Sequence, residues 1–279
     1  MVSTRRNGWL VTCSAVAVPL RRSDRLPVGG DPSREERMEE TNRASEVAWG
    51  YEGETGPDHW GGLDPCFALC DSGSRQSPVD LANAIPAAAG DMLDIRWQAT
   101  DACVLDTGHT VQVDMAEGSF IVLEGREFSL TQFHFHLPSE HTVGGARYAL
   151  EAHFVHVAAA GDLAVIGTFI EIGGEDVNIQ RIWEAIPAYG ASPVMLSGFD
   201  PATLLPGGRV YARYTGSLTT PPCSEAVHWV VMAEPTFASQ AQVDLFSKLH
   251  PPNARPVQPL NGRTITLHGS STQPERNRR

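Results

Sequence analysis

Short runs of alternating or branched apolar residues dominate the chain from residue 111 onward. Residues 111–115 read Val-Gln-Val-Asp-Met, and this alternation of apolar and polar positions is typical of a half-buried strand. Five further runs are rich in β-branched and aromatic residues and are bounded by turn signals, which again indicates strands. They cover residues 119–123, 132–137, 149–157, 163–172 and 226–232. Many short strands predict a mainly β (α+β) fold with a large sheet.

Two segments repeat their apolar residues at the spacing of an α-helix instead. Residues 176–186 place three isoleucines on one face, and Pro187 follows as a stop signal. Residues 239–249 begin with Ser-Gln-Ala-Gln, a capping-box pattern that typically opens a helix. Because such segments are few, we expect short helices at the periphery of the sheet.

Composition divides the chain into one folded domain and two polar ends. Residues 21–47 are nearly all polar or charged, so they cannot bury enough apolar surface to offset the entropy of ordering. We interpret the chain as a signal peptide at 1–17, a disordered linker at 18–47, a single domain at 48–269 and a flexible tail at 270–279.

The interpretation of residues 1–17 as a signal peptide rests on three features. Arg5 and Arg6 give a basic start, a short apolar run follows, and Ala-Val-Ala resembles a cleavage site. We therefore favour a periplasmic or secreted protein. The alternative is a translation start at Met38, which would leave the protein in the cytoplasm.

The charge and hydropathy of the chain argue against nucleic-acid and membrane partners. The formal net charge is -12, and the first 48 residues carry eight Arg against seven Asp and Glu, so the acidic excess lies in the body of the protein. An acidic body repels phosphate backbones, and we expect no nucleic-acid partner. No apolar run approaches the ~20 residues that a spanning helix needs, so we expect no stable membrane anchor.

Five cysteines occur, at positions 13, 66, 70, 103 and 223. None of them forms a Cys-x-x-Cys pair, which excludes a zinc ribbon or a thioredoxin-type motif. Their spacing alone leaves open which of them are oxidised.

Histidines on two strands carry the candidate chemistry. In residues 132–136, Gln-Phe-His-Phe-His, strand alternation places His134 and His136 on one face and both phenylalanines on the other. His153 shares a face with Glu151 in the strand that follows, and pairing of the two strands would bring all three histidines together. Three imidazoles bind zinc and leave the fourth tetrahedral position open, as catalytic rather than structural zinc sites do.

A simpler interpretation competes with the zinc site. A lone histidine on a strand is most often a hydrogen-bonded structural residue, and a His-x-His pattern alone is a weak indication of a metal. The neighbouring residues favour the metal, because a metal-bound histidine normally donates its second N–H to an amide, a carboxylate or a carbonyl. Gln132 and Glu151 each lie two residues before a candidate ligand on the same face. We therefore expect Zn²⁺ as the cofactor.

Motifs in the same order over nearly the whole domain resemble the alpha-class carbonic anhydrases, in particular the bacterial form. The resemblance extends from Trp49 to Leu267. Besides the histidine segments, it includes residues 49–51, 56–61, 76–79, 108–113, 139–141, 216–223, 253–256 and 258–261. It implies one domain with a large twisted, mostly antiparallel sheet of about ten strands. It also implies a zinc lyase (carbonate dehydratase) in which zinc-bound hydroxide reversibly hydrates carbon dioxide to bicarbonate and a proton.

The resemblance implies roles for individual residues around the metal. The zinc ligands would be His134, His136 and His153. Their supporting partners, in the same order, would be Gln132, the backbone of Asn253 and Glu151.

Further roles concern catalysis and the substrate. Thr219 would accept a hydrogen bond from the hydroxide and donate one to Glu140, and His109 would carry the proton to solvent. The substrate pocket would be lined by Val155, Val165, Leu218, Thr220, Val227 and Trp229. Asp106 and Thr107 stand where the family commonly has two asparagines, a departure that concerns proton transfer rather than the zinc chemistry.

The resemblance also implies a disulfide between Cys70 and Cys223, as in exported members. For Cys66 and Cys103 it implies no partner, and we expect both to remain thiols that behave as small hydrophobic residues. The partner would be a small-molecule substrate, carbon dioxide or bicarbonate, and the protein would be a monomer or a homodimer. Two other functions compete with this one: a zinc-dependent esterase, and a non-catalytic binding module.

Overall fold

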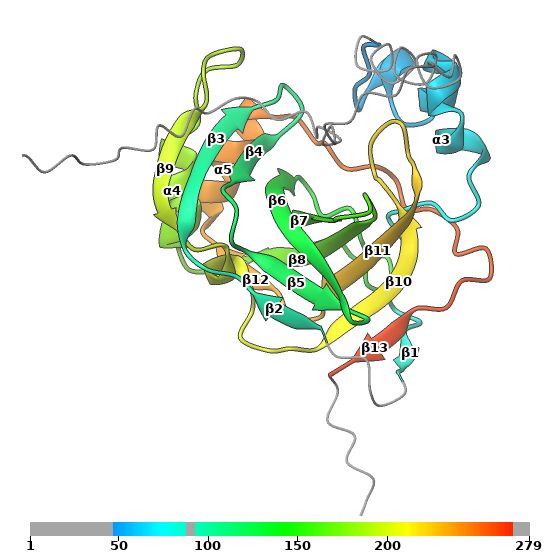
Figure 1. Ribbon diagram of the computed structural model, residues 1–279. Helices are drawn as coiled ribbons and strands as arrows, with labels where there is room; N and C mark the ends of the chain where they lie inside the picture. The colour runs from blue at the N-terminus through cyan, green and yellow to red at the C-terminus, as the bar shows by residue number, and fades with distance from the viewer. Residues whose placement is uncertain (1–46, 88–92, 270–279) are drawn as a thin grey trace, which may run out of the picture.

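A single sheet organises the computed structural model, which describes residues 47–87 and 93–269 (Figure 1). The predictions for residues 1–17 and 270–279, and nearly all of the predicted linker, lie outside the described residues. The strands are β1 (Ile85–Pro86), β2 (Asp94–Arg96), β3 (Thr100–Asp106), β4 (Val111–Met115), β5 (Phe120–Leu123), β6 (Arg126–His136), β7 (Leu150–Ala158), β8 (Leu163–Ile172), β9 (Val194–Phe199), β10 (Tyr211–Ser217), β11 (Glu225–Met232), β12 (Thr236–Ala238) and β13 (Thr266–His268).

The strand order confirms the predicted large, mostly antiparallel sheet. Ten strands follow one path, β1-β13-β10-β11-β8-β7-β6-β4-β3-β9, while β12 pairs with β8, and β2 and β5 extend from β6. The parallel pairs are β1–β13, β8–β11 and β8–β12, and the other pairs are antiparallel. The sheet is therefore larger than the ten strands expected, because short strands are added at its margins.

A bulge in β6 decides which side chains face the site. The register of β6 against β7 shifts between Leu130 and Gln132. Before the bulge, Phe128 and Leu130 face the larger core, and after it the odd-numbered Phe133 and Phe135 do. One inserted residue changes the phase of the alternation. This is why the apolar pattern predicted a strand from residue 132, whereas β6 begins at Arg126.

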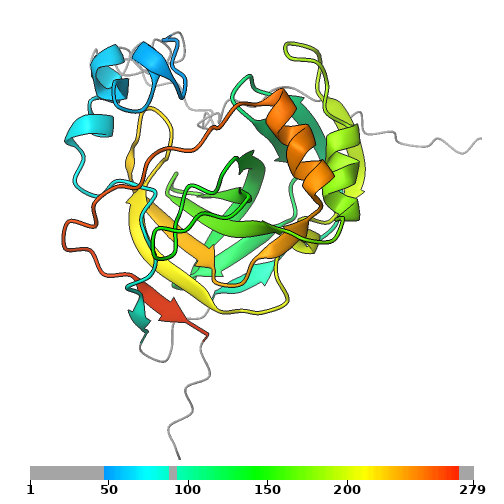
Figure 2. The same ribbon diagram turned by 180° about the vertical axis from the view of Figure 1, so that it is seen from behind.

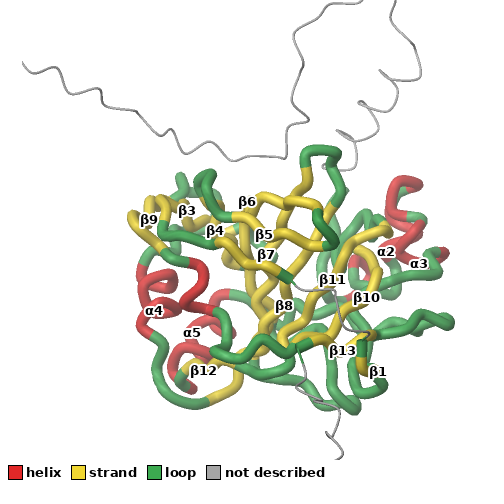
Figure 3. The backbone as a smooth tube through the Cα atoms, turned by 60° about the horizontal axis from the view of Figure 1, so that its bottom comes forward, coloured by secondary structure: helices red, strands yellow, loops and turns green. Residues whose placement is uncertain are grey.

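The helices lie at the margins of the sheet. They are α2 (Trp60–Leu63), α3 (Leu69–Ser72), α4 (Val177–Glu184) and α5 (Gln240–Leu249), with 3₁₀ turns η1 (Gly53–Thr55), η2 (Pro65–Phe67) and η3 (Pro201–Leu204). Figure 3 shows two groups, α4 with α5 at one end of the molecule and α2 with α3 at the other. The expected peripheral helices are thus confirmed.

Local capping explains where α4 and α5 begin. The Asp176 carboxylate accepts the backbone N–H groups of Asn178 and Ile179 at the start of α4. The capping box predicted at Ser239 is present, with reciprocal bonds to Gln242. Capping satisfies N–H groups that the first helical turn would otherwise leave without acceptors. Both helices are seen from behind in Figure 2.

The two helices support the sheet behind the histidines. The Phe135 ring lies 4.8 Å from the ring of Trp183 in α4 and 6.3 Å from that of Phe246 in α5. Phe133 and Phe154 are fully buried in the same core. Burying a side chain of this size contributes about 1.5–3 kcal/mol. This packing fixes β6 and β7, and with them the histidines on their opposite face.

His156 belongs to this rear core and not to the cluster of candidate ligands. It lies opposite Leu130, is fully buried, accepts a hydrogen bond from Trp97 Nε1 at 3.2 Å and donates Nδ1–H to the carbonyl oxygen of Ala164 at 3.3 Å. Burial lowers its pKa from the ordinary 6.5 to about 3. The ring is therefore neutral at physiological pH, and both of its nitrogens are occupied by structural hydrogen bonds.

Burial of His156 predicts a pH dependence of stability. Between pH 6.5 and 3 the unfolded state binds a proton that the folded state excludes, so folding stability falls by about 1.4 kcal/mol per pH unit as the pH is lowered. In His156→Gln this contribution disappears. Urea unfolding at pH 7.5, 6.0 and 5.0 should show a steeper loss of stability in the wild type than in the variant. Parallel pH profiles for the two proteins would contradict the prediction, whatever their difference at pH 7.5.

Candidate active site

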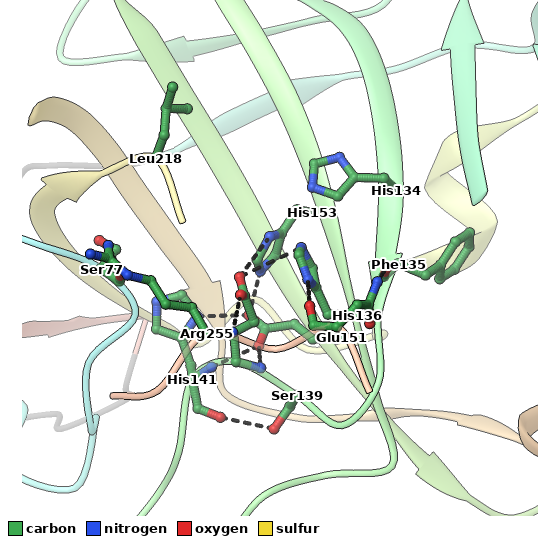
Figure 4. Close-up of polar contacts among 12 residues, drawn as sticks. Ser77, His134, Phe135, His136, Ser139, His141, Glu151, His153, Leu218 and Arg255 are labelled. Carbon is green, nitrogen blue, oxygen red and sulfur yellow. Dashed lines mark hydrogen bonds and ion pairs between the residues drawn. The ribbon is translucent and has the colours of Figure 1, made fainter. Parts of the chain in front are cut away.

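Pairing of β6 with β7 brings the three predicted ligands together. His134 lies directly opposite His153, and His136 lies opposite Glu151. The ring centroids are 5.1 Å apart for His134 and His136, 5.5 Å for His134 and His153, and 4.5 Å for His136 and His153. One nitrogen from each ring lies within 4.8 Å of the others. Figure 4 shows the three imidazoles projecting from adjacent strands into one space.

A supporting partner lies at one nitrogen of each ring, as expected. His134 Nδ1 lies 2.9 Å from Gln132 Oε1, and His136 Nδ1 lies 2.8 Å from the carbonyl oxygen of Asn253. His153 Nε2 lies 3.0 Å from Glu151 Oε1, an ion-pair distance without the alignment of a hydrogen bond. Such oxygens only accept hydrogen bonds, so Gln132 and Asn253 fix the N–H on the outer nitrogens of His134 and His136. The Glu151 carboxylate favours an N–H on His153 Nε2 by its charge.

The remaining nitrogens have the chemistry of a metal site. With the outer nitrogens protonated, the inner ones keep their lone pairs for a cation. His136 Nε2 is buried and has no hydrogen-bond partner among the described residues. Burial lowers the pKa of both His134 and His136, and repulsion from the other histidines adds to it, so both rings are neutral. Three convergent imidazole nitrogens, each neutral when it binds a metal, fit a zinc ion.

Glu151 is the centre of a buried hydrogen-bond network. Its Oε2 accepts the backbone N–H groups of Glu140 and His141, each at 2.9 Å, and its Oε1 accepts His141 Nδ1–H at 2.8 Å. Burial alone would raise the pKa of this carboxyl, but His141 and His153 hold it well below its usual range. Glu151 therefore stays ionised beside His153. Burial alone would lower the pKa of the His153 imidazole, but the charge of Glu151 outweighs burial and raises it.

The network continues through residues to which the sequence assigned no role. His141 Nε2 lies 2.7 Å from the Tyr214 hydroxyl, which lies 2.8 Å from Ser77 Oγ. Ser77 Oγ accepts the backbone N–H of Ser217 at 3.0 Å. The signal was present, because Ser77 and His141 both lie in matched motifs. Strand parity could not reveal it, because the partners come from distant parts of the chain.

The hydrogen bond expected from Thr219 to Glu140 is not among those formed by the described residues, and the catalytic role of Thr219 stays a prediction. Thr219 is buried but makes no side-chain hydrogen bond within residues 47–87 and 93–269. Glu140 Oε1 accepts the Arg255 backbone N–H at 2.8 Å. This contact turns Oε2 toward the ligands, 3.5 Å from His136 Nε2 and 3.8 Å from His153 Nδ1, where it has no hydrogen-bond partner.

Arg255 ties this carboxylate to the first part of the domain. It is only 1% exposed, and its guanidinium donates to the carbonyl oxygens of Ser77 and Cys70 at 2.8 and 2.9 Å. It also donates to Gln76 Oε1 at 2.9 Å and lies 5.6 Å from the centre of the Trp60 ring. The same residue thus contacts Glu140 through its backbone and residues 60–77 through its side chain.

His109 lies apart from the three ligands, in the turn between β3 and β4. Its ring is half-buried and stacks on Trp49, with centroids 3.9 Å apart and an angle of 7° between the planes. Asn253 Nδ2 donates to the His109 carbonyl oxygen at 2.9 Å, so the residue that supports His136 also holds this turn. Burial, followed by repulsion from His250, lowers the pKa of His109.

The predicted apolar wall lies beside the ligands. Five of its residues belong to one apolar cluster: Val155, Val165, Leu218, Val227 and Trp229. The Trp229 ring lies 4.8 Å from the His153 ring, and its Nε1 donates to the Ser217 carbonyl oxygen at 2.9 Å. Thr220 is half-buried in the following turn, where its carbonyl oxygen accepts the Cys223 N–H. The structure therefore places five of the six predicted pocket residues in one cluster, which contacts His153 through Trp229.

The disulfide between Cys70 and Cys223 is confirmed and joins residues 153 positions apart. It connects α3 to the turn that carries Thr219 and Thr220. The expectation for Cys103 is wrong, because this residue is disulfide-bonded. Its neighbours Ala102 and Val104 face the core, so strand alternation directs Cys103 to the outer, half-exposed face, where a sulfur partner can reach it. Within the described residues, no helix is long and apolar enough to span a membrane.

Comparisons with known proteins identify the family of the chain. Residues 55–269 match the family model described as eukaryotic-type carbonic anhydrase. A protein named carbonic anhydrase from Nostoc sp. is 44% identical over 229 residues, which cover 80% of this chain and 87% of the relative.

Two solved structures have the same fold over almost their full length. The alpha-carbonic anhydrase from Thermovibrio ammonificans, in complex with the inhibitor sulfanilamide, has a TM-score of 0.76 and 42% identity, covering 79% of this chain and 99% of its own. A hyperthermostable carbonic anhydrase from a hydrothermal vent chimney has a TM-score of 0.77 and 44% identity, with the same coverage. The resemblance seen in the motifs is confirmed: this chain belongs to the eukaryotic-type, or alpha, carbonic anhydrase family of lyases.

Proposed function

We propose that the protein catalyses the reversible hydration of carbon dioxide to bicarbonate and a proton at a zinc ion held by His134, His136 and His153. The observation that carries this proposal is the set of three convergent imidazoles, each with an acceptor at its outer nitrogen. When bound, zinc supplies a water of lowered pKa and a Lewis acid. Membership of the carbonic anhydrase family supports the assignment of the substrate.

Residues around the ligands hold them in place for this chemistry. Gln132, Asn253 and Glu151 fix the tautomers and the ring orientations, which keeps the inner nitrogens available for the metal. Glu140 Oε2 is a carboxylate oxygen without a hydrogen-bond donor of its own, close to two of the ligands. A rotation of the Thr219 hydroxyl toward it would let Thr219 donate to Glu140. The lone pairs of the Thr219 hydroxyl oxygen could then accept a hydrogen bond from a donor at the reacting centre and so orient that donor.

The substrate proposal rests on the apolar side of the site. Val165, Val227 and Trp229 are almost fully buried, and they present hydrocarbon and aromatic surface next to His153. Such a surface suits a small nonpolar molecule that offers no strong hydrogen-bonding group. We assign the binding of carbon dioxide to this surface, together with Val155, Leu218 and Thr220.

Each turnover releases a proton, and we assign its removal to His109. Imidazole is the side chain that titrates nearest to neutral pH. The His109 ring stacks on Trp49 and is half-buried at the rim of two cavities. The lowered pKa of His109 keeps its ring neutral and able to accept a proton. The Asp106 and Thr107 side chains line one of these cavities, so the departure from the family pattern falls on this path.

The Cys70–Cys223 disulfide supports an oxidising compartment, because such bonds persist mainly outside the cytosol. We therefore propose a periplasmic or secreted enzyme with its catalytic domain at residues 48–269.

Stopped-flow carbon dioxide hydration on protein of known zinc content tests the function. Chelator-stripped protein should be inactive, and activity should rise in proportion to bound zinc, up to about one ion per chain. A fully zinc-loaded protein without carbon dioxide hydration would refute the proposal. Rapid ester hydrolysis by that same inactive preparation would favour the esterase alternative, and zinc binding with neither activity would favour a binding module.

A further inference from the structure

Two cavities meet at the turn that carries His109. One of about 310 Å³ is lined by residues that include Tyr51 and Asn253, whose carbonyl oxygen contacts His136 Nδ1. The other, of about 370 Å³, includes Asp106, Tyr189 and His250. Of the residues that line them, only Gly108 and His109 line both. His109 therefore borders both cavities, and the second has room for several water molecules.

His250 is an unusual residue in this second cavity. It follows the last residue of α5 and is only 3% exposed, with its ring against Phe246 at a centroid distance of 5.4 Å. Its Nε2 is buried and makes no hydrogen bond with any described residue. Buried polar atoms are normally satisfied, so an exception needs an explanation. The closest charged atom is Asp106 Oδ1, 3.5 Å away.

Asp106 links His250 to the turn of His109. Its Oδ1 also accepts the Gly108 N–H at 2.8 Å, which closes the turn. Gly108 has a φ of +81°, and a Cβ placed there would lie 2.7 Å from the ring of Tyr189. Position 108 thus requires glycine, and the turn brings Asp106 and His109 to one cavity wall. Burial lowers the pKa of both histidines. The charge of Asp106 opposes this lowering at His250, and repulsion from His250 adds to it at His109.

We propose that His250, paired with Asp106, is a second proton-accepting residue that takes the proton from His109 and passes it to solvent. The step balances as an acid–base exchange. The His109 imidazolium loses a ring proton through cavity water and becomes neutral. A ring nitrogen of His250 accepts that proton and forms an imidazolium beside the Asp106 carboxylate. Transfer to a buffer base then returns His250 to its neutral form.

The electrostatic surroundings of the two rings differ. Burial lowers the pKa of both histidines, so both rings accept protons from a neutral state. Repulsion from His250 lowers the pKa of His109 further, whereas attraction to Asp106 opposes the lowering at His250. This inference rests on the proposed carbon dioxide hydration, because only that reaction delivers a proton to His109.

The test separates proton removal from the chemistry on carbon dioxide. We would measure kcat and kcat/KM for the wild type, His109→Ala, His250→Gln and the double variant, in dilute buffer and with added imidazole. His250→Gln should lower kcat in dilute buffer by roughly 3- to 10-fold, less than the ~100-fold or more that a direct acid–base group supplies. Its kcat/KM should be unchanged, and imidazole should restore kcat. The double variant should be no slower than His109→Ala, because the residues act in series.

Asp106→Asn provides a second variant that keeps an oxygen acceptor for the Gly108 N–H and removes the charge. It should also lower kcat in dilute buffer and be restored by imidazole. His59→Gln, at an exposed histidine, is the matched control and should behave as wild type.

Three results would overturn the proposal. One is a wild-type kcat in both His250→Gln and Asp106→Asn. Another is an equal fall of kcat and kcat/KM that imidazole does not restore, which would indicate a structural role. The last is an additive loss in the double variant, which would place His250 on an independent path. A wild type without carbon dioxide hydration would instead refute the proposed function itself, so the two failures are distinguishable.

Discussion

His136→Ala should lose both zinc and carbon dioxide hydration. The His136 imidazole supplies one of three nitrogen donors, and its Nδ1 is fixed by the Asn253 carbonyl oxygen at 2.8 Å. Two remaining histidines cannot complete a three-nitrogen site. The loss in metal affinity should therefore exceed the ~10- to 100-fold that removal of a supporting partner costs. Zinc content after dialysis and stopped-flow hydration measured on the same samples would test this result.

A graded series makes this prediction sharper. Gln132→Ala leaves all three ligands in place and removes only the acceptor of His134, so its zinc affinity should fall within that 10- to 100-fold range. His59→Ala, outside the site, should match the wild type. Retention of zinc and activity by His136→Ala would contradict the assignment of the ligands. An equal loss in His136→Ala and Gln132→Ala would show that supporting contacts, and not ligand number, limit binding.

The second large effect concerns stability. The Cys70–Cys223 disulfide closes a loop with a sequence separation of 153 residues. Its removal in the double variant Cys70→Ser, Cys223→Ser should lower the free energy of unfolding by about 2–5 kcal/mol, because the unfolded chain gains conformational freedom. Urea unfolding of the wild type and the double variant would measure the difference.

Cys66→Ser is the control for this variant, since it changes a nearby cysteine outside that bond. Its stability should stay within ~0.5 kcal/mol of the wild type. Equal stability of the double variant and the wild type would show that the loop is already restrained by other contacts. The hydrogen bond from Gln76 to the Cys223 carbonyl oxygen is one such contact.

Periodicity alone predicted the parts of the fold in which one face is buried. The bounds of β4 follow directly from alternation, and those of β8 from a continuous apolar run. Capping and apolar spacing predicted the two long helices, α4 and α5. Strands such as β3 and β10 mix polar and apolar residues on both faces, so their pairing partners, rather than their own pattern, decide their conformation. The position of β9 beside β3 is likewise a tertiary property.

Different parts of the candidate site were predicted by different kinds of reasoning. Strand parity placed His134, His136 and Glu151 correctly, because it depends only on neighbours in the sequence. The resemblance to a family supplied Asn253 and the disulfide, which no local rule could give. Neither approach indicated that the Arg255 backbone N–H would bind Glu140 Oε1 and leave Oε2 beside His136 and His153. That orientation depends on a single backbone hydrogen bond between segments 115 residues apart.

The buried guanidinium of Arg255 sets a limit for redesign of this protein. Residues 60–77 supply no zinc ligand, so a minimal enzyme could be imagined that starts at β1. Such a fragment would lack Gln76 and the backbone acceptors at Cys70 and Ser77, and the aromatic face of Trp60. The Arg255 guanidinium would then lose these hydrogen-bond acceptors, and a buried charged group without them is costly. Residues 60–77 therefore belong to the smallest part of the chain that could be transferred with the site, although they supply none of the candidate ligands.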